Sequence, residues 1–297
     1  MFVRVVKNRT MLSVMVLLWA ATFWGVVWYP LRLLEAAGLS GLWTTWVIFT
    51  SAALPGLWLS WTQRRVLGEQ PGLLLLVALA NGWLNTAFVL AVLEGNVVRV
   101  LLLFYLSPLW STVLGWWWLG ESPSRLGLAT LGLAMGGALF MLWNPQLGFP
   151  WPQDRADWLA ISAGLGFSFS NVAVRRLRHM PAVLKATVTW WGVVLVAGVW
   201  LLFAQVPIPV ISGETWAWAV VLGGLGIFSA SLALIYGVEN MPVHRSAVIL
   251  LFELVAGAVS SLWLTDEIIT PREWLGGVLI IVAAYLSAAE TSQENGP

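Results

Sequence analysis

Hydrophobic residues form long runs along this chain, separated by short clusters of Pro, Gly and charged residues. Runs such as 73–93 and 97–119 are apolar on all sides and do not alternate between apolar and polar positions. A run of about 20 apolar residues is long enough to cross a bilayer as a helix, whereas a transmembrane strand would alternate. The pattern therefore predicts membrane-spanning helices.

The breaks between these runs predict ten spans, because Pro, Gly and charged clusters interrupt apolar helices. The first run follows basic residues, as a signal peptide would, but we expect it to be retained because nine further runs follow and no convincing cleavage site is present. No connection is long enough for a soluble domain, so the expected fold is an all-α integral membrane protein. The predicted spans lie near residues 11–29, 41–61, 73–93, 97–119, 125–143, 157–174, 183–204, 214–236, 243–264 and 273–289.

The composition agrees with a membrane protein and excludes several classes of site. Hydrophobic residues make up 59% of the 297 positions and charged residues 10%, with a mean hydropathy of +0.83, whereas soluble domains carry roughly 25% charged residues. The chain has no cysteine and a net charge of +1, which argues against thiolate chemistry and nucleic-acid binding. Its two His residues are far apart and neither Lys follows a Gly-rich loop, so no metal, cofactor or ATP site is expected.

The basic residues predict the orientation through the positive-inside rule. An N-terminus inside the cell places eleven of the 15 Lys and Arg residues on the cytoplasmic side. We therefore expect a multi-pass protein of a bacterial-type cytoplasmic (inner) membrane with both termini in the cytoplasm. The eleven are Arg4, Lys7, Arg9, Arg64, Arg65, Arg125, Arg175, Arg176, Arg178, Lys185 and Arg245.

An internal repeat relates 97–121 to 243–267 at an offset of 146 residues without a gap. The offset is close to half the chain length, which predicts two five-helix repeats at 1–148 and 149–297. Because five is odd, the halves would run through the membrane in opposite directions, an arrangement common in secondary transporters with a substrate site near the midplane. The aligned identities are Val97 with Val243, Arg99 with Arg245, Val113 with Val259, Trp117 with Trp263, and Glu121 with Glu267.

Short motifs in both halves resemble the drug/metabolite transporter superfamily, in its ten-span EamA-type branch. The first half carries Tyr105-Leu106-Ser107-Pro108 and then Leu119-Gly120-Glu121. The second half departs from this pattern, because Phe252-Glu253-Leu254 keeps a Glu but lacks the Pro, and Thr265-Asp266-Glu267 replaces L-G-E. The resemblance implies ten helices around a central cavity, alternating access, and export of amino acids or other metabolites. Among relatives the chain looks most like aromatic and neutral amino-acid exporters.

Glu253 lies ten residues inside the predicted span 243–264, near the bilayer centre. An ionisable residue at this depth is costly and marks a functional hypothesis. Ser246, Gly257 and Ser260 extend a small and polar helix face on its side. Glu253 is therefore either a proton site or partner for a substrate ammonium, or the partner in a hydrogen bond between helices.

Other polar residues within the spans are candidates for the substrate site. At the repeat offset Ser107 matches Glu253, and Pro108 is expected to kink its helix because it lacks a backbone donor. Asn81 and Asn85 share a helix face, and such amides either bond between helices or bind a ligand. The predicted substrate-binding residues are Tyr105, Ser107, Asn81, Asn85, Glu253, Trp24, Asn171 and Ser231.

Arg99 and Arg245 lie at the outer and inner ends of the two matching helices, each with an acid nearby, Glu94 and Glu239. They are either structural and topogenic, or they form ion pairs of a gate. Glu121, like its counterpart in the second half, precedes the last helix of its half, where an anion is favoured at the helix N-terminus.

The favoured function is a secondary transporter that exports small organic metabolites by alternating access, with amino acids, including aromatic ones, as the expected class. One alternative is a carrier for nucleotide-sugar, lipid-linked or other drug-like substrates, which would need cations for any phosphate. An intramembrane enzyme would need a nucleophile–base pair at depth, and an assembly protein would not need a repeat. The expected partners are a small-molecule substrate and the lipid bilayer, without nucleic acid or an ATPase subunit, and the expected state is a monomer.

Overall fold

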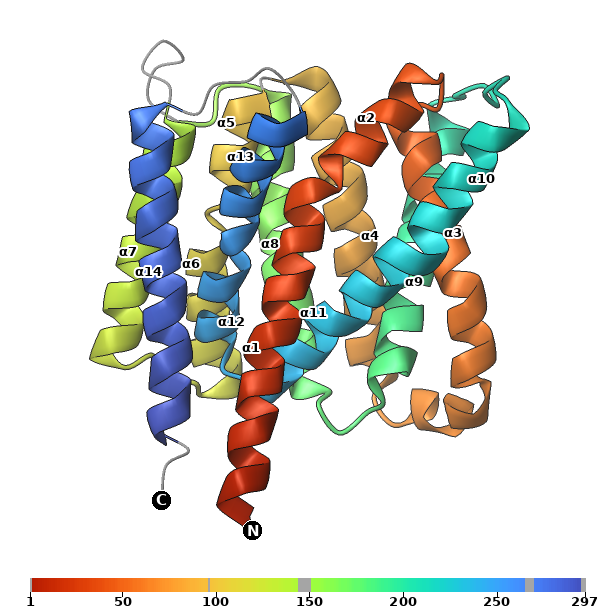
Figure 1. Cartoon of the computed structure of the whole chain (residues 1–297). Coiled ribbons are helices and arrows are strands. Elements are labelled where there is room, and N and C mark those ends of the chain that lie inside the picture. The colour runs from red at the N-terminus through yellow and green to blue at the C-terminus, as the bar shows by residue number, and fades with distance from the viewer. Residues whose placement is uncertain (1, 96, 144–150, 265–269, 295–297) are drawn as a thin grey trace.

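The computed structural model describes residues 2–95, 97–143, 151–264 and 270–294, and these segments form a bundle of helices without a strand (Figure 1). α1 begins and α14 ends at the same end of the bundle, which we call the termini end; the opposite end is the far end (Figure 1). The first half contains α1 (Phe2–Val26), α2 (Trp28–Ala36), α3 (Gly41–Ser60), the 3-10 helix η1 (Trp61–Gly68), α4 (Pro71–Glu94), α5 (Val97–Phe104), α6 (Ser107–Leu114), the π-helix η2 (Gly115–Leu119) and α7 (Arg125–Leu142).

The second half contains five further long helical stretches, two of which are divided into shorter elements. They are α8 (Arg155–Arg176), α9 (Ala182–Phe203), α10 (Gly213–Val221) with the π-helix η4 (Leu222–Ile227) and α11 (Phe228–Asn240), α12 (Val243–Leu250) with α13 (Phe252–Leu264), and α14 (Pro271–Glu294).

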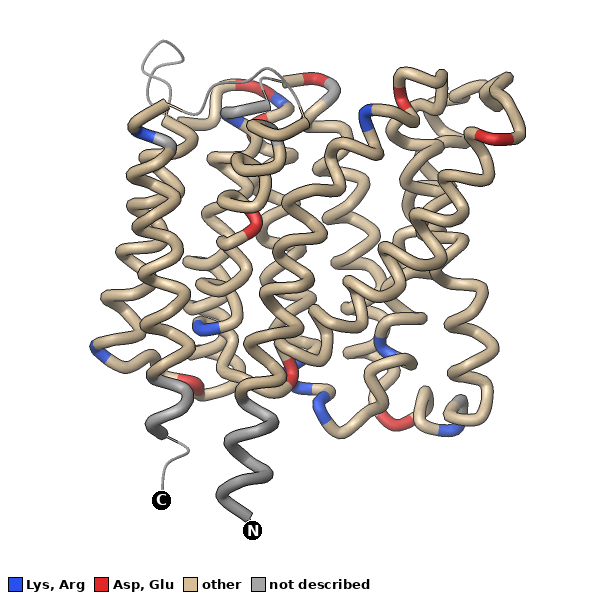
Figure 2. The backbone as a smooth tube through the Cα atoms, in the orientation of Figure 1, with Lys and Arg blue, Asp and Glu red and all other residues tan. Residues whose placement is uncertain are grey.

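Eight helical stretches among the described residues are long and apolar enough to cross a membrane, and α14 contains a shorter apolar helix, Trp274–Ala289. The prediction of an all-helical multi-pass membrane protein is therefore confirmed. Several predicted spans match the helices closely: 41–61 corresponds to α3 and 125–143 to α7, each within one residue at either end. Charged residues gather at the two ends of the bundle (Figure 2), as expected where the chain meets water.

The predicted span 157–174 forms α8, a 22-residue helix that is absent from those eight stretches. Its composition explains the difference, because α8 carries basic residues in its last turn, Asp157 in its first turn, and several serines. Most of its residues are buried, and it packs against α4, α5 and α6. A helix enclosed by other helices can carry polar residues that a lipid-facing helix cannot.

Close helix contacts depend on glycine, as is usual where transmembrane helices approach each other. Gly137 of α7 and Gly276 of α14 face each other, and a Cβ on either would lie within 2.6 Å of the other's carbonyl oxygen. Gly137 also lies near Ile280, and Gly276 lies near Met141. Residue numbers thus rise along one helix as they fall along the other, so α7 and α14 are antiparallel.

Candidate functional site

Two helices of the bundle are broken at matching positions. The first break separates α5 from α6 after Phe104, and the second separates α12 from α13 after Leu250. α5 and α12 begin and end at residues that are 146 apart, which is the offset of the sequence repeat. The breaks lie near the middle of their apolar stretches, so they create irregular backbone at mid-membrane depth, where such backbone is tolerated only inside the protein.

The first break has a local cause in Pro108, which lies in the first turn of α6. Because proline has no N–H, the carbonyl of Phe104 lacks its regular donor four residues on. Gly164 of α8 covers this carbonyl, and a Cβ at Gly164 would lie 2.8 Å from the Phe104 oxygen. The predicted kink at Pro108 is thus present as a full break.

The second break has no proline. Leu254, the counterpart of Pro108, instead donates its N–H to the carbonyl of Leu251 three residues back at 3.1 Å. Gly25 of α1 packs against this break, and a Cβ there would lie 2.4 Å from the backbone oxygen of Glu253. Each break is therefore covered by a glycine on the first helix of the other half.

The side chains of Tyr105 and Glu253 meet between the two breaks. The Tyr105 hydroxyl donates to Oε1 of Glu253 at 2.6 Å, joining residues 148 apart in sequence. Tyr105 is buried, whereas Glu253 keeps part of its surface accessible. This contact is the interhelical hydrogen bond considered for Glu253, and it brings together two of the predicted site residues at the centre of the bundle.

An aromatic cluster adjoins this pair on its α4 and α8 side. The ring of Phe104 lies edge-on to Tyr105 at 5.4 Å, to Phe88 at 5.0 Å and to Phe167 at 5.9 Å between centroids. Edge-to-face packing of this kind stabilises ring pairs beyond the area they bury. A carboxylate and a phenol therefore lie beside an apolar aromatic wall.

The predicted amides lie on α4 and bond mainly within the protein. Asn81 donates from Nδ2 to the Ser170 hydroxyl of α8 and to the carbonyl of Val77, the latter at 3.0 Å. Asn85 donates to the carbonyl of Asn81 at 2.9 Å. These bonds provide the partners that carboxamides need away from water, and they tie Asn81 to α8.

Ser107 is joined to α8 through its backbone. The hydroxyl of Ser168 donates to the Ser107 carbonyl at 2.9 Å, and Ser111 donates to the Ser168 hydroxyl at 3.0 Å. The Ser107 side chain is buried, as expected at the start of α6. The structure therefore positions Ser107 beside the first break, two residues from Glu253's partner Tyr105.

The remaining predicted residues lie on other elements of the bundle. Trp24 packs edge-on against Phe23 at 5.7 Å, and its buried Nε1 has no hydrogen-bond acceptor among the described residues. Asn171 on α8 and Ser231 on α11 are buried. No described hydrogen bond joins these three residues to the Tyr105–Glu253 pair. The predicted site residues thus lie on several different helices.

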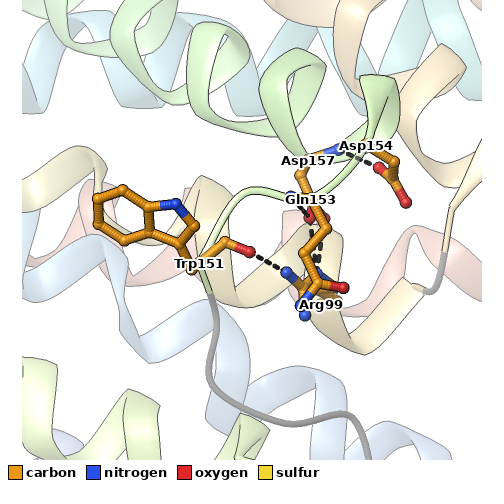
Figure 3. A network of polar contacts seen from close by, with 5 residues as sticks. All are labelled: Arg99, Trp151, Gln153, Asp154 and Asp157. Carbon is orange, nitrogen blue, oxygen red and sulfur yellow. Dashed lines mark hydrogen bonds and ion pairs between the residues drawn. The ribbon is translucent and has the colours of Figure 1, made fainter.

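Arg99 forms an ion pair at the far end, but its acid is Asp157 rather than the nearby Glu94 (Figure 3). The guanidinium Nε lies 2.9 and 2.7 Å from the two carboxylate oxygens, and both side chains are buried. Arg99 also donates to the carbonyl of Trp151. Glu94 instead pairs with Arg155 at 3.5 Å on the surface. Glu94 lies five residues before Arg99 in sequence, whereas Asp157 lies on α8, against which α5 packs.

Sequence reasoning missed Asp157 and Lys185, although both are buried and charged. Asp157 is held by the first turn of α8, where Asp154 accepts from its backbone N–H at 2.9 Å (Figure 3). Lys185 on α9 bonds the Glu239 carboxylate at the termini end, whereas Glu239 was expected beside Arg245. Arg245 itself is buried in α12. The signal available for Asp157 was an aspartate at the first position of the predicted span 157–174.

Comparison with known proteins decides the family once this geometry is known. The EamA-like transporter family matches residues 11–143 and 154–289. The chain belongs to the EamA-like transporter family. It is a membrane transporter of that family, in agreement with the motifs at Tyr105 and Glu121.

Two relatives of this EamA-like transporter extend the comparison. The chain is 25% identical over 258 residues to an uncharacterized transporter of Haemophilus influenzae (strain ATCC 51907 / DSM 11121 / KW20 / Rd), covering 84% of this chain and 74% of the relative. A solved crystal structure with 18% identity superposes with a TM-score of 0.75, covering 96% of this chain and 99% of that one. At this identity the second likeness shows a shared fold.

Proposed function

We propose that this protein is a secondary transporter that exports a small organic metabolite by alternating access, and that the metabolite is an amino acid with an aromatic side chain as the favoured case. The observation that carries the proposal is the Tyr105–Glu253 hydrogen bond between two coincident helix breaks. A carboxylate at mid-membrane is a site for a proton or for a substrate ammonium. The wall around Phe104 suits an apolar side chain on the same ligand.

The proposed architecture is ten spans arranged as two inverted five-helix repeats. α8 and α14 supply the two spans beyond the eight apolar stretches. Three observations support the repeat: α5 and α12 share their bounds at the offset of 146, α7 and α14 begin at Arg125 and Pro271 with the same offset, and the family matches one stretch in each half. The antiparallel packing of α7 and α14 supports inversion, because these two helices are equivalent in the repeat.

Release of Glu253 from Tyr105 is the proposed chemical step. A charge at this depth costs about 2.5–3.5 kcal/mol on insertion scales, so the Glu253 carboxylate needs a partner, which in this structure is the Tyr105 hydroxyl. A substrate ammonium or a proton would replace the Tyr105 hydroxyl as the partner of the carboxylate. Differential binding of this kind between two states of the protein is what couples a ligand to a conformational change.

The carrier alternative with phosphorylated substrates needs cations within reach of the site. Three buried or largely buried cations of the described residues are already paired with acids: Arg99 with Asp157, Arg175 with Glu121 and Lys185 with Glu239. This pairing supports an uncharged-overall substrate over a nucleotide-sugar.

A matched set of ligands tests the proposal. Proteoliposomes loaded with phenylalanine should support counterflow of labelled phenylalanine, with competition from phenethylamine, which keeps the ammonium, and little from 3-phenylpropionate, which lacks it. Glu253→Gln should reduce the flux at least about tenfold, because Gln cannot carry a charge for the ammonium or trade a proton. Glu94→Gln, on the surface, is the matched control. Wild-type flux in Glu253→Gln would leave Glu253 as a purely structural hydrogen bond.

A further inference from the structure

A network of charged groups joins five elements at the termini end. Glu121 follows the left-handed Gly120 that ends η2, and its carboxylate lies between α8 and α12. The sequence suggested that Glu121 stabilises the start of α7. The structure shows a different contact, because Oε2 accepts the backbone N–H of Val243, the first residue of α12, at 2.9 Å.

The other oxygen of the same carboxylate bonds the second half through α8. Oε1 of Glu121 accepts from Nε of Arg175 at 2.8 Å, and both side chains are largely buried. Arg175 extends the network, since its Nη1 donates to the carbonyl of Glu239 at 2.5 Å. The Glu239 carboxylate in turn binds Lys185, which is fully buried and also donates to the carbonyl of Leu177 at 3.1 Å.

The far end has ion pairs of its own. Arg99 connects α5 to Asp157 of α8 and to the adjoining carbonyl of Trp151 (Figure 3). The two side chains of this ion pair lie on α5 and α8. Asp157 also accepts from the backbone of Gln153 at 2.8 Å, so its second contact stays within the start of α8.

The two parts of the second broken helix, α12 and α13, differ in how deeply their residues are buried. All eight residues of α12 are buried, from Val243 to Leu250. Past the break, α13 keeps accessible surface at Glu253, Val255 and Gly257. The part of this helix nearest the termini end is therefore enclosed, and the network around Glu121 lies at its first residue.

We propose that Glu121 holds the termini end closed by bridging Arg175 of α8 to the N-terminus of α12, and that it releases both when that end opens. This inference rests on the proposed alternating access. Glu121 belongs to the first half, whereas both of its partners belong to the second. One carboxylate thus links the two halves at the termini end, and charge-assisted bonds to a guanidinium and a helix N-terminus are among the stronger single contacts.

The absence of cysteine from the chain makes the opening measurable. Ser246 lies one turn into α12 and is 1% exposed, so Ser246→Cys should react slowly with a maleimide on purified protein in detergent. Adding Glu121→Ala should raise that rate at least about tenfold, because the population of open molecules rises by the same factor. Glu94→Ala breaks a surface ion pair at the far end and should leave the rate unchanged.

A second reporter separates opening from loss of structure. Ala134 is fully buried in α7, and the labelling rate of Ala134→Cys should stay the same in Glu121→Ala. Arg175→Lys keeps the charge, but a lysine lacks the guanidinium that donates to both the Glu121 carboxylate and the Glu239 carbonyl. It should therefore raise the labelling rate of Ser246→Cys less than Glu121→Ala does. This variant carries the test if Glu121→Ala does not fold.

The outcomes distinguish this inference from the proposed function. An unchanged Ser246 rate in Glu121→Ala and Arg175→Lys, or equal acceleration at Ala134, overturns the closing role of Glu121 even when phenylalanine counterflow is intact. Faster labelling at Ser246 alone supports it. If that labelling pattern is found but the wild-type protein shows no counterflow, the closure stands and the proposed transport fails.

Discussion

The hydroxyl of Tyr105 is the smallest group on which the proposed site depends. It donates a hydrogen bond to Glu253, and this bond joins two helices at the positions where their regular backbone hydrogen bonding is interrupted. The type and depth of Glu253 could be predicted from the sequence, because an acid within an apolar run is conspicuous. The hydrogen-bond partner of Glu253 could not be predicted, because the repeat aligns Glu253 with Ser107. In the structure its partner is Tyr105, two residues earlier.

Tyr105→Phe should lower thermal stability by a few degrees, because it leaves a buried carboxyl oxygen without its donor at a cost of about 1–3 kcal/mol. Size-exclusion recovery after heating in detergent would measure the change. Tyr285→Phe is the matched control, since Tyr285 is 72% exposed on α14. Equal midpoints for Tyr105→Phe and the wild type would show that the bond contributes nothing to the folded state.

At the scale of the elements, span positions follow from apolar length, and so they were predicted within a few residues for α3, α4, α7 and α9. The interruption between α5 and α6 also follows from local chemistry at Pro108. The interruption between α12 and α13 does not, because Leu254 has an N–H and nothing nearby in sequence forbids a continuous helix. Ion pairs such as Arg99 with Asp157 depend on which helices pack together, which local patterns do not encode.

Adjacent glycines in α7 allow a direct test of helix packing. Gly137→Ala should destabilise the protein by about 1–3 kcal/mol, because the new Cβ would lie 2.6 Å from the carbonyl oxygen of Gly276. Gly136→Ala should be neutral or stabilising by up to about 1 kcal/mol, because no atom lies within 4 Å and Ala favours a helix. Heating midpoints of the two variants in detergent would be compared. Similar midpoints would contradict close packing of α7 on α14.

For the whole molecule, one offset and the count of spans predict two inverted halves, whereas the contacts between the helices could not be predicted from the sequence. The bundle brings the start of α1 and the end of α14 to one side (Figure 1). The predicted spans place eleven of the 15 Lys and Arg residues on the side of the termini. Helix pairs between halves, such as α1 with α13 and α8 with α6, appear only when the chain is folded.

A green fluorescent protein fused after Pro297 should fluoresce, and alkaline phosphatase fused after Gln205 should be active, because the positive-inside rule keeps the termini in the cytoplasm. Gln205 follows α9 at the far end, so the two fusions report opposite sides. Exchanging the two reporters between the two sites is the control, and both signals should then be lost. An active phosphatase after Pro297 would reverse the proposed orientation.

The coincident interruptions have a mechanical consequence. When one end of a continuous helix tilts, the other end tilts with it. A helix that is interrupted at its middle consists of two short helices that can tilt independently about the break. α12 can then stay fixed while α13 swings, and α5 and α6 can do the same in the other half. Gly25 and Gly164 let a neighbouring helix lie directly against the backbone of each break. Under the proposed alternating access, bending at these two breaks would open one side of the membrane without rotating one half of the protein against the other.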